Sequence, residues 1–214
     1  LRACIDSVKN QTYGNWELCL VDDCSTDEAV RETLRLYENQ EKIKIRYREE
    51  NGHISRATND GIAMADGEFI ALLDCDDVYS VDALYEVVKL LNEDAGYDFI
   101  YSDEDKLSED GTKRRNPFFK PDWSPDTFMS LMYTCHLSVY RKTLLEELGG
   151  LRVGLEGSQD YDLVLRVMEK TKRIGHIPKI LYHWREREES TANAISAKPY
   201  IIEATRKAKL DALE

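Results

Sequence analysis

The sequence predicts an α/β fold, with a mostly parallel sheet flanked by helices. In the first half of the chain, short apolar segments typical of buried strands alternate with segments whose apolar residues recur every three or four positions, as in amphipathic helices. Successive strands lie roughly 25 residues apart, enough for a helical crossover between parallel strands. Ligands of such sheets bind where the strands end, so polar residues at those points are candidate site residues.

Four strands are predicted in this half, at residues 16–21, 43–47, 69–73 and 98–101. Helices are predicted at 1–8 and 57–65, and two more follow the capping candidates Ser25 or Thr26 and Ser80.

The second half is less regular, because residues 103–115 are charged and rich in turn formers and residues 117–125 contain three aromatics. We expect this half to cover the sheet. Its predicted elements are helices at 126–132, 160–170 and 200–213 and short strands at 174–177 and 180–184.

The composition is that of an ordinary globular domain. The 214 residues carry 29 Lys and Arg against 41 Asp and Glu, a net charge of −12, and 42% of them are hydrophobic. No apolar run approaches the roughly 20 residues that span a bilayer, so an integral membrane protein is excluded. The acidity argues against nucleic acid as a partner and favours cation binding.

The five cysteines form no CxxC pair, and their number is odd. We interpret them as reduced, mostly buried thiols, which indicates a reducing compartment. Because the sequence enters an amphipathic pattern at Leu1 and the pattern of the last helix still runs at Glu214, the chain is expected to be a fragment.

Three carboxylates follow the apolar strand that ends at Leu73. Asp74, Asp76 and Asp77 lie within four residues, with little nearby to neutralise them. Proteins hold Mg²⁺ or Mn²⁺ by one or two carboxylates, with substrate phosphates and waters completing the shell. The cluster therefore predicts a metal that binds a phosphate ester, and a helix-capping turn with solvated acids is the alternative.

Two weaker candidates precede this cluster. Asp22 ends a strand and can accept a hydrogen bond from a ribose hydroxyl or a base N–H, although an Asx-turn explains such a residue equally well. Arg56 lies near the start of a helix, where its charge and the free backbone N–H groups suit phosphate oxygens; a surface arginine is the alternative.

The order of these motifs resembles the family 2 glycosyltransferases of the GT-A fold. The resemblance spans Leu1 to about Trp184, and the segments that carry it are Gln11–Glu17, Val21–Asp27, Asn51-Gly52 with Arg56, Ala65–Ile70 and Asp74–Asp77. It implies an inverting transfer of a sugar from a nucleoside diphosphate, with UDP expected, to a hydroxyl of a polysaccharide or related glycan.

The resemblance also implies roles for single residues. Mn²⁺ or Mg²⁺ would bind at the DxD motif, with Asp76 as the direct ligand and Asp74 closer to the ribose. Asp22 would contact the uracil or ribose, and Arg56 would lie near the nucleotide. The family begins with an apolar strand that contacts the base, and this sequence starts after it, so the sheet is expected to lack that strand.

Further implied residues lie in the second half. Gln159-Asp160 stand where the family shows Glu-Asp, so Asp160 is the expected general base, with a helix N-cap or a first-turn acid that interacts with the helix dipole as the alternative. His183 is implied as a metal ligand or diphosphate contact, and a structural histidine is the alternative. Asp103, His136 and Trp184 are implied contacts of the acceptor, against core packing for the tryptophan ring.

The resemblance divides the chain into three parts. Residues 1–101 are expected to form the nucleotide-sugar-binding half of one domain, residues 102–198 its acceptor-binding and general-base half, and residues 199–214 a helix that leads into a further domain. It implies a cytoplasmic location, with peripheral association of the parent protein at the inner face of the membrane as one option.

Two other functions stay open. Residues 72–78 also fit the haloacid dehalogenase pattern, in which Asp74 would be a phosphorylated nucleophile, but that motif lies on the first strand of those enzymes and three strands precede it here. A catalytically silent nucleotide-sugar binding module is the second alternative, and metal-dependent hydrolysis of the donor separates it from a transferase.

Overall fold

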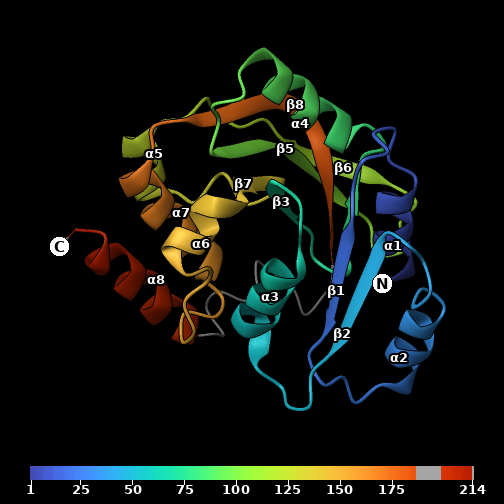
Figure 1. The fold of residues 1–214 in the computed structure, drawn as a ribbon. Helices are drawn as coiled ribbons and strands as arrows, with labels where there is room; N and C mark the ends of the chain where they lie inside the picture. The colour runs from blue at the N-terminus through green and yellow to red at the C-terminus, as the bar shows by residue number, and fades with distance from the viewer. Residues whose placement is uncertain (187–198, 214) are drawn as a thin grey trace.

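A computed structural model describes residues 1–186 and 199–213, and this part of the chain forms two sheets surrounded by eight helices (Figure 1). The strands are β1 (Leu18–Asp22), β2 (Ile43–Tyr47), β3 (Phe69–Leu72), β4 (Val78–Tyr79), β5 (Phe99–Leu107), β6 (Arg114–Phe118), β7 (Ser138–Arg141) and β8 (Ile174–Arg185). The helices are α1 (Arg2–Lys9), α2 (Glu28–Arg35), α3 (His53–Met64), α4 (Ala83–Glu93), α5 (Pro125–Ser130), α6 (Lys142–Leu148), α7 (Gln159–Lys170) and α8 (Pro199–Asp211).

The predicted α/β class is confirmed, and the registers add detail to it. The smaller sheet is a parallel pair of β1 and β2. The larger sheet has the order β3-β7-β5-β8-β4, with β6 beside β5. Its long central pair, β5 and β8, is parallel, whereas β7, β4 and β6 run antiparallel to their neighbours, which the sequence pattern did not indicate.

The two sheets are separated by a cavity rather than joined. In the part of the chain that the structure describes, β1 pairs with β2 alone and β3 pairs with β7 alone. The cavity has a volume of about 1890 Å³, and its walls include residues Leu18–Asp22 and Phe69–Leu72.

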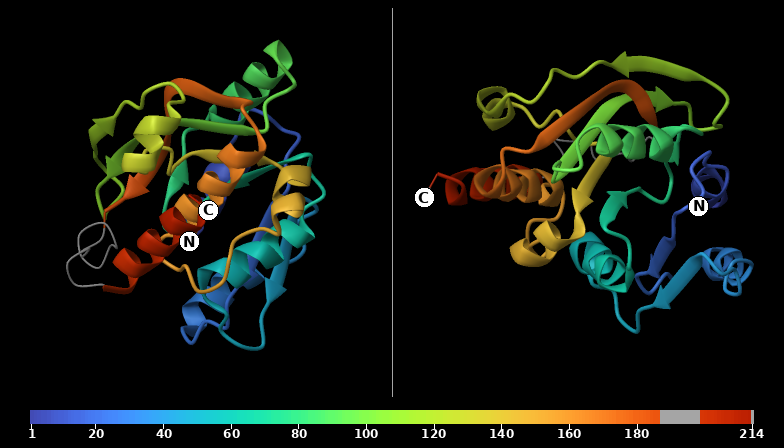
Figure 2. Two further views of the ribbon diagram at one scale, coloured as in Figure 1. Left: turned by 90° about the vertical axis from the view of Figure 1, so that its left-hand side faces the viewer. Right: turned by 45° about the horizontal axis from the view of Figure 1, so that its top comes forward.

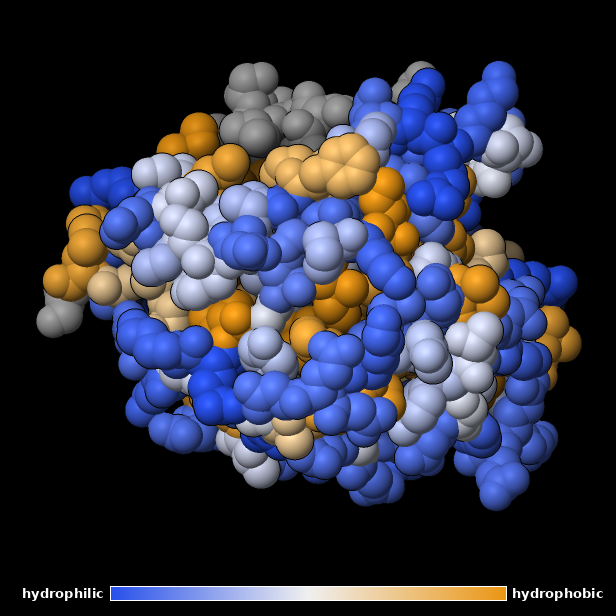
Figure 3. All heavy atoms as spheres, turned by 90° about the horizontal axis from the view of Figure 1, so that it is seen from above, coloured by the Kyte–Doolittle hydropathy of each residue, from blue (hydrophilic) through white to orange (hydrophobic). Residues whose placement is uncertain are grey.

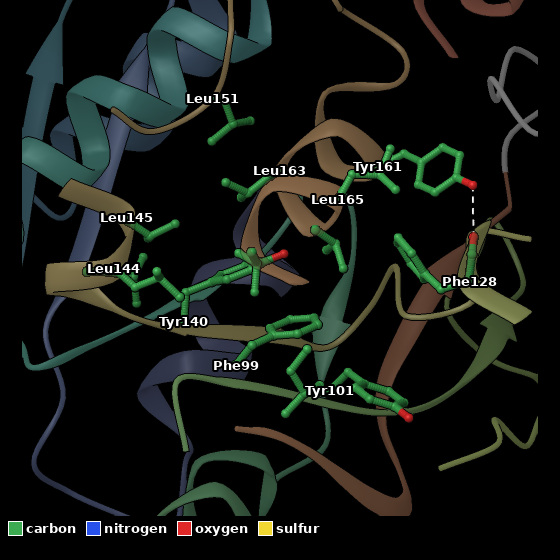
Figure 4. Packing of buried hydrophobic residues seen from close by; sticks show 14 of the residues in the cluster. Phe99, Tyr101, Phe128, Tyr140, Leu144, Leu145, Leu151, Tyr161, Leu163 and Leu165 are labelled. Carbon is green, nitrogen blue, oxygen red and sulfur yellow. Dashed lines mark hydrogen bonds between the residues drawn. The ribbon is translucent and has the colours of Figure 1, made fainter. Parts of the chain in front are cut away.

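The larger sheet is covered on both faces because successive strand residues point to opposite sides. Phe99 packs against α6 and α7 and stacks on Tyr140, with ring centroids 4.7 Å apart. Figure 4 shows this layer, in which the Tyr161 hydroxyl of α7 also donates a 2.8 Å hydrogen bond to the Phe128 carbonyl of α5. Ile100, the next residue, belongs to the opposite layer under α4. This sandwich fixes the strand ends that border the cavity.

The main difference from the predicted elements is the length of β5. Residues 103–107 continue the strand, although their charges predicted a turn-rich stretch. Each acid is buried beside a partner from a distant segment: Asp103 meets His176, Glu104 meets Lys120, and Asp105 meets His183. No local sequence pattern shows such pairing, so this part of the strand was not predicted.

Smaller corrections concern caps, strands and thiols. Asp27, rather than Ser25 or Thr26, caps α2 by accepting a hydrogen bond from Ala29 N. The two short strands expected near the end are the single strand β8, and β7 and α6 were not predicted. All five cysteines are free, but only Cys4 is fully buried, so the expectation of mostly buried thiols is wrong.

The predicted boundary at residue 101 falls inside β5, which therefore belongs to both expected halves. The expected final helix is present as α8, and residues 187–198 of the second half lie outside the described residues.

Hydrophilic side chains cover most of the face in Figure 3, with hydrophobic patches between them. No described helix is both long and apolar enough to cross a membrane.

A buried carboxylate joins α7 to its surroundings. Asp162 is fully buried and accepts hydrogen bonds of 2.9 Å from the Nε atoms of both Arg152 and Arg166. Arg166 also donates to the carbonyls of Leu148 and Gly150, and Arg152 donates to Asp211 of α8. The contact with Asp211 links this network to α8, which lies beside α7 (Figure 2).

We expect Asp162→Asn to lower the free energy of unfolding by about 3 kcal/mol, because it leaves two arginines without their buried counter-charge. Urea denaturation measures this change. Asp211→Asn, which removes the half-buried outer partner, is the matched control and should cost less than about 1 kcal/mol. Equal losses in the two variants would contradict the central role of Asp162.

Candidate functional site

The cavity between the sheets gathers most of the candidate residues in one place. Its walls contain Asp22, Asp74, Asp76, His136, Asp160 and Trp184. Arg56, Asp103 and His183 are not among the residues that line it. Six residues predicted from separate motifs therefore share one hollow, whereas three do not reach it in this conformation.

The acidic loop lies between β3 and β4 and is held by groups of β8. Asp77 is buried, and its carboxylate accepts hydrogen bonds from the Tyr182 hydroxyl (2.6 Å) and the Arg185 backbone N–H (2.7 Å). The Tyr182 oxygen in turn accepts a 3.2 Å hydrogen bond from Asp74 N. These contacts fix the loop so that the side chain of Asp74 faces the cavity, with half of its surface exposed.

Three groups of the site are close enough to share a cation. Asp74, Asp77 and His136 each offer a ligand atom, and these atoms lie within 4.8 Å of one another. His136 is held in place by stacking on Tyr182, with ring centroids 4.3 Å apart. Two carboxylates and an imidazole suit Mn²⁺ or Mg²⁺ with open positions for other ligands, so the residues fit the predicted metal.

Crowding of the acids shifts their proton affinities. Although half of the Asp74 side chain is exposed, the protein around it displaces water and raises its pKa to about 7, and the charges of Asp77, Asp76 and Asp160 add to the shift. Burial likewise raises the pKa of Asp77 to about 6. The pKa of His136 falls to about 3, through burial and the charges of Lys120 and Lys106, so its imidazole is neutral and able to bind a metal.

The candidate base, Asp160, lies in the first turn of α7. Its Oδ1 accepts a 3.0 Å hydrogen bond from Tyr161 N, and its Oδ2 accepts one of 3.3 Å from the Cys135 thiol. Burial raises the pKa of Asp160. The N-cap of α7 is Ser158, so Asp160 is not the cap, but a carboxylate in the first turn also suits the helix dipole.

The structure separates His183 from the acidic loop. Neighbouring residues of a strand face opposite sides, and Tyr182 and Trp184 both contact His136 while His183 does not. The His183 Nδ1 atom lies 2.6 Å from Asp105 Oδ1. The contact with Asp105 engages Nδ1 and leaves Nε2 as the atom that would bind a metal, so the role of His183 as a metal ligand stays a prediction.

The remaining candidates differ in their surroundings. Lys106 Nζ lies 3.0 Å from the centre of the Trp184 ring, so one ring face is already covered. Asp22 Oδ1 accepts a hydrogen bond from Ser25 N, and its buried Oδ2 has no hydrogen-bond partner within the described residues, although Arg31 Nε lies 3.5 Å away. Arg56 is exposed.

Asp103 is buried beneath the site rather than in it. Its Oδ1 atom lies 2.9 Å from both Lys120 N and His176 Nε2, which gives it a structural position between segments. The sequence did not single out Cys135, Tyr182 or Arg185, which contact the candidate base and the acidic loop. The only local signal was their place in segments 133–136 and 182–185, beside other candidates.

Comparisons with known proteins identify the family. A family model described as Glycosyl transferase family 2 matches residues 1–149. An uncharacterized protein, y4gI, of Sinorhizobium fredii is 47% identical over 207 residues, and the O-antigen biosynthesis protein RfbC of Myxococcus xanthus is 42% identical over 194 residues. The matches cover 95% and 90% of this chain, but only 23% and 15% of those longer proteins.

Solved structures support the same fold. S. aureus TarS, residues 1–349, in complex with UDP-GlcNAc has a TM-score of 0.75 and 21% identity, covering 96% of this chain and 60% of that one. The mannosyltransferase PcManGT of Pyrobaculum calidifontis, in complex with GDP-Man and Mn²⁺, has a TM-score of 0.70 and 19% identity, covering 95% and 58%. The chain belongs to glycosyltransferase family 2, and its expected GT-A fold is confirmed.

The raised pKa values predict a pH-dependent stability of the metal-free protein. Protonated Asp74 favours the native state, so its contribution is fully present below the ordinary pKa of about 4 and is lost as the pH rises through about 7. Asp74→Asn should therefore match the wild type near pH 4 and exceed its stability at pH 8. Since solvent screens a half-exposed side chain, we expect a gain of about 1 kcal/mol.

Thermal unfolding from pH 4 to 8 in a chelator measures this difference. Asp110→Asn is a control without this trend, because hydrogen bonds from Ser108 and Thr112 lower the pKa of Asp110 to about 2, so its carboxylate is charged in both states through most of this pH range. A stability difference for Asp74→Asn that stays constant with pH would refute the shift.

Proposed function

We propose that this family 2 glycosyltransferase moves a sugar from a UDP-sugar to a hydroxyl of a polysaccharide or related glycan, with inversion at the anomeric carbon. The observation that carries the proposal is the common cavity, which is lined by the acidic loop and by the carboxylate of Asp160. Its volume of about 1890 Å³ leaves room for a donor and part of an acceptor.

The acidic loop is the proposed site of the donor diphosphate. Asp74 and His136, with Asp77 and the DxD residue Asp76, would hold Mn²⁺ or Mg²⁺ there. Such a cation supplies positive charge that stabilises the departing diphosphate. The described residues that line the cavity contain many more carboxylates than cationic side chains, so a phosphate ligand needs this added charge.

The other end of the cavity is the proposed nucleoside site. The unpartnered oxygen of Asp22 can accept the imide N–H of uracil or a ribose hydroxyl. The structural neighbours were crystallised with UDP-GlcNAc and with GDP-Man, so both nucleotides merit comparison. The exposed Arg56 would reach the nucleotide from the first turn of α3.

Asp160 is the proposed general base. Inverting transfer needs one group that takes the proton of the acceptor hydroxyl while its oxygen attacks the anomeric carbon. The hydrogen bonds from Cys135 and Tyr161 orient the carboxylate, and burial keeps its proton affinity above that of a solvated aspartate. Inversion converts an α-linked donor into a β-linked product.

Family membership favours this proposal over a phosphatase that uses Asp74 as a nucleophile. A silent binding module differs from the proposed enzyme only in turnover. The relatives RfbC and the chondroitin synthase of Pasteurella multocida are named for polysaccharide synthesis, which supports a glycan acceptor. The cytoplasmic location stays a prediction.

Calorimetric titration of UDP, with and without Mn²⁺, tests the donor site without knowledge of the sugar. We expect UDP to bind measurably only with Mn²⁺, and GDP to bind more weakly. Asp76→Ala and His136→Ala should each weaken the Mn²⁺-dependent binding about tenfold or more, because each removes a ligand.

His183→Ala provides the matched comparison for His136→Ala. Equal loss in both variants would assign His183 a part in metal binding as well, whereas loss in His136→Ala alone would assign the ligand to His136. Unchanged binding of UDP by Asp76→Ala in Mn²⁺ would remove Asp76 from the site.

Asp160→Asn separates binding from turnover. The amide keeps the shape of the carboxylate but accepts no proton, so transfer should fall by about 10²- to 10⁴-fold while UDP affinity stays near that of the wild type. Release of UDP from a panel of UDP-sugars with saccharide acceptors measures turnover. Gln159→Ala, at the neighbouring cavity residue, is the control, and unchanged turnover in Asp160→Asn would exclude it as the base.

A further inference from the structure

The guanidinium of Arg185 touches the acidic loop without using a carboxylate. Its Nε donates a 2.7 Å hydrogen bond to the backbone carbonyl of Asp76. Its own backbone N–H is the group that donates to Asp77 Oδ1. One residue at the end of β8 therefore binds two successive residues of the loop, one through the main chain and one through the side chain.

The other end of the guanidinium is anchored on the hairpin between β5 and β6. Arg185 Nη1 donates to the carbonyls of Glu109 (2.9 Å) and Ser108 (3.4 Å). The hairpin is itself braced, since Asp110 Oδ1 accepts hydrogen bonds from Ser108 Oγ (2.5 Å) and from the N–H (3.0 Å) and hydroxyl (2.8 Å) of Thr112. The arginine thus ties the loop to a fixed point outside the cavity.

The hairpin leaves space for the arginine at Gly111. This residue has φ of +74°, and a Cβ there would lie 3.0 Å from Arg185 Nη1. A side chain at this position would strain the backbone and press on the guanidinium. The hairpin is therefore shaped to receive Arg185, although it contributes no residue to the cavity wall near Asp76.

We propose that Arg185 is a positioning residue that holds the acidic loop in the shape that binds the cation and diphosphate, through the Asp76 carbonyl and the Ser108–Gly111 hairpin. The planar guanidinium donates hydrogen bonds to the loop and to the hairpin at the same time, and a lysine ammonium at this position does not reproduce that geometry. The positive charge under the loop also offsets part of the repulsion among its carboxylates. The consequence for cation binding rests on the proposed function, whereas the effect on the loop does not.

Amide hydrogen exchange of peptides covering residues 73–79 tests the proposal in the metal-free protein. Arg185→Ala should speed exchange in this segment about tenfold, because the loss of about one hydrogen bond lowers the free energy of local opening. Arg185→Lys should restore little of it. Gly111→Ala keeps the arginine in the sequence but displaces its guanidinium, so it should also speed exchange in this segment. This variant tests the proposal if Arg185→Ala folds poorly.

Two controls match these variants. Arg35→Ala removes an arginine from a surface ion pair on α2. Gly149→Ala puts a side chain at φ of +71° where nothing lies within 4 Å, so it carries the backbone strain without the contact. Both controls should leave exchange at residues 73–79 as in the wild type.

Mn²⁺ affinity, followed by the EPR signal of free Mn²⁺, gives the second readout. We expect Arg185→Ala and Gly111→Ala to weaken Mn²⁺ binding in the presence of UDP about tenfold, the effect typical of groups that orient metal ligands. Wild-type exchange at residues 73–79 in both variants would overturn the proposal. Failure of the wild type to bind Mn²⁺ would instead refute the proposed function, and the exchange data would still decide the role of Arg185.

Discussion

The buried carboxylate of Asp77 is the contact on which the candidate site depends. It accepts hydrogen bonds from Tyr182 and from the backbone of Arg185, so it joins the loop after β3 to the end of β8 across more than a hundred residues of sequence. An unpaired carboxylate at this depth would be costly, and the two donors meet that cost. These hydrogen bonds fix the conformation of the loop between β3 and β4, which places Asp74 and Asp76 at the cavity beside His136.

The same arrangement concentrates negative charge at one wall. The charges of Asp77, Asp76 and Asp160 add to the raised pKa of Asp74, and those of Lys120 and Lys106 add to the lowered pKa of His136. Carboxylates are crowded in this way at sites that bind a cation or transfer a proton. Under the proposed function, a cation bound at this wall would allow an acidic domain to bind a strongly anionic diphosphate.

Sequence reasoning identified the strand ends correctly, since the apolar segments before Asp22 and Asp74 are short and bounded by polar residues. Six of the nine candidate residues also line the cavity, because motifs at strand ends converge in an α/β fold. Sequence reasoning missed the extension of β5 through Asp103, Glu104 and Asp105, whose charges are neutralised by His176, Lys120 and His183 from distant segments. Pairing of that kind is a property of the tertiary structure, which no local pattern contains.

The histidines depend on tertiary packing in the same way. The motif that contains His183 predicts a ligand, and this stays a prediction: the alternation of side chains along β8 turns the ring towards Asp105, and His136 lies beside Asp74. The proposed cation would therefore lie between the acidic loop and His136. Anomalous scattering from a crystal grown with UDP and Mn²⁺ tests this proposal directly: one peak is expected between Asp74, Asp76 or Asp77 and His136, and a peak bound by His183 instead, or none at the acidic loop, would contradict it.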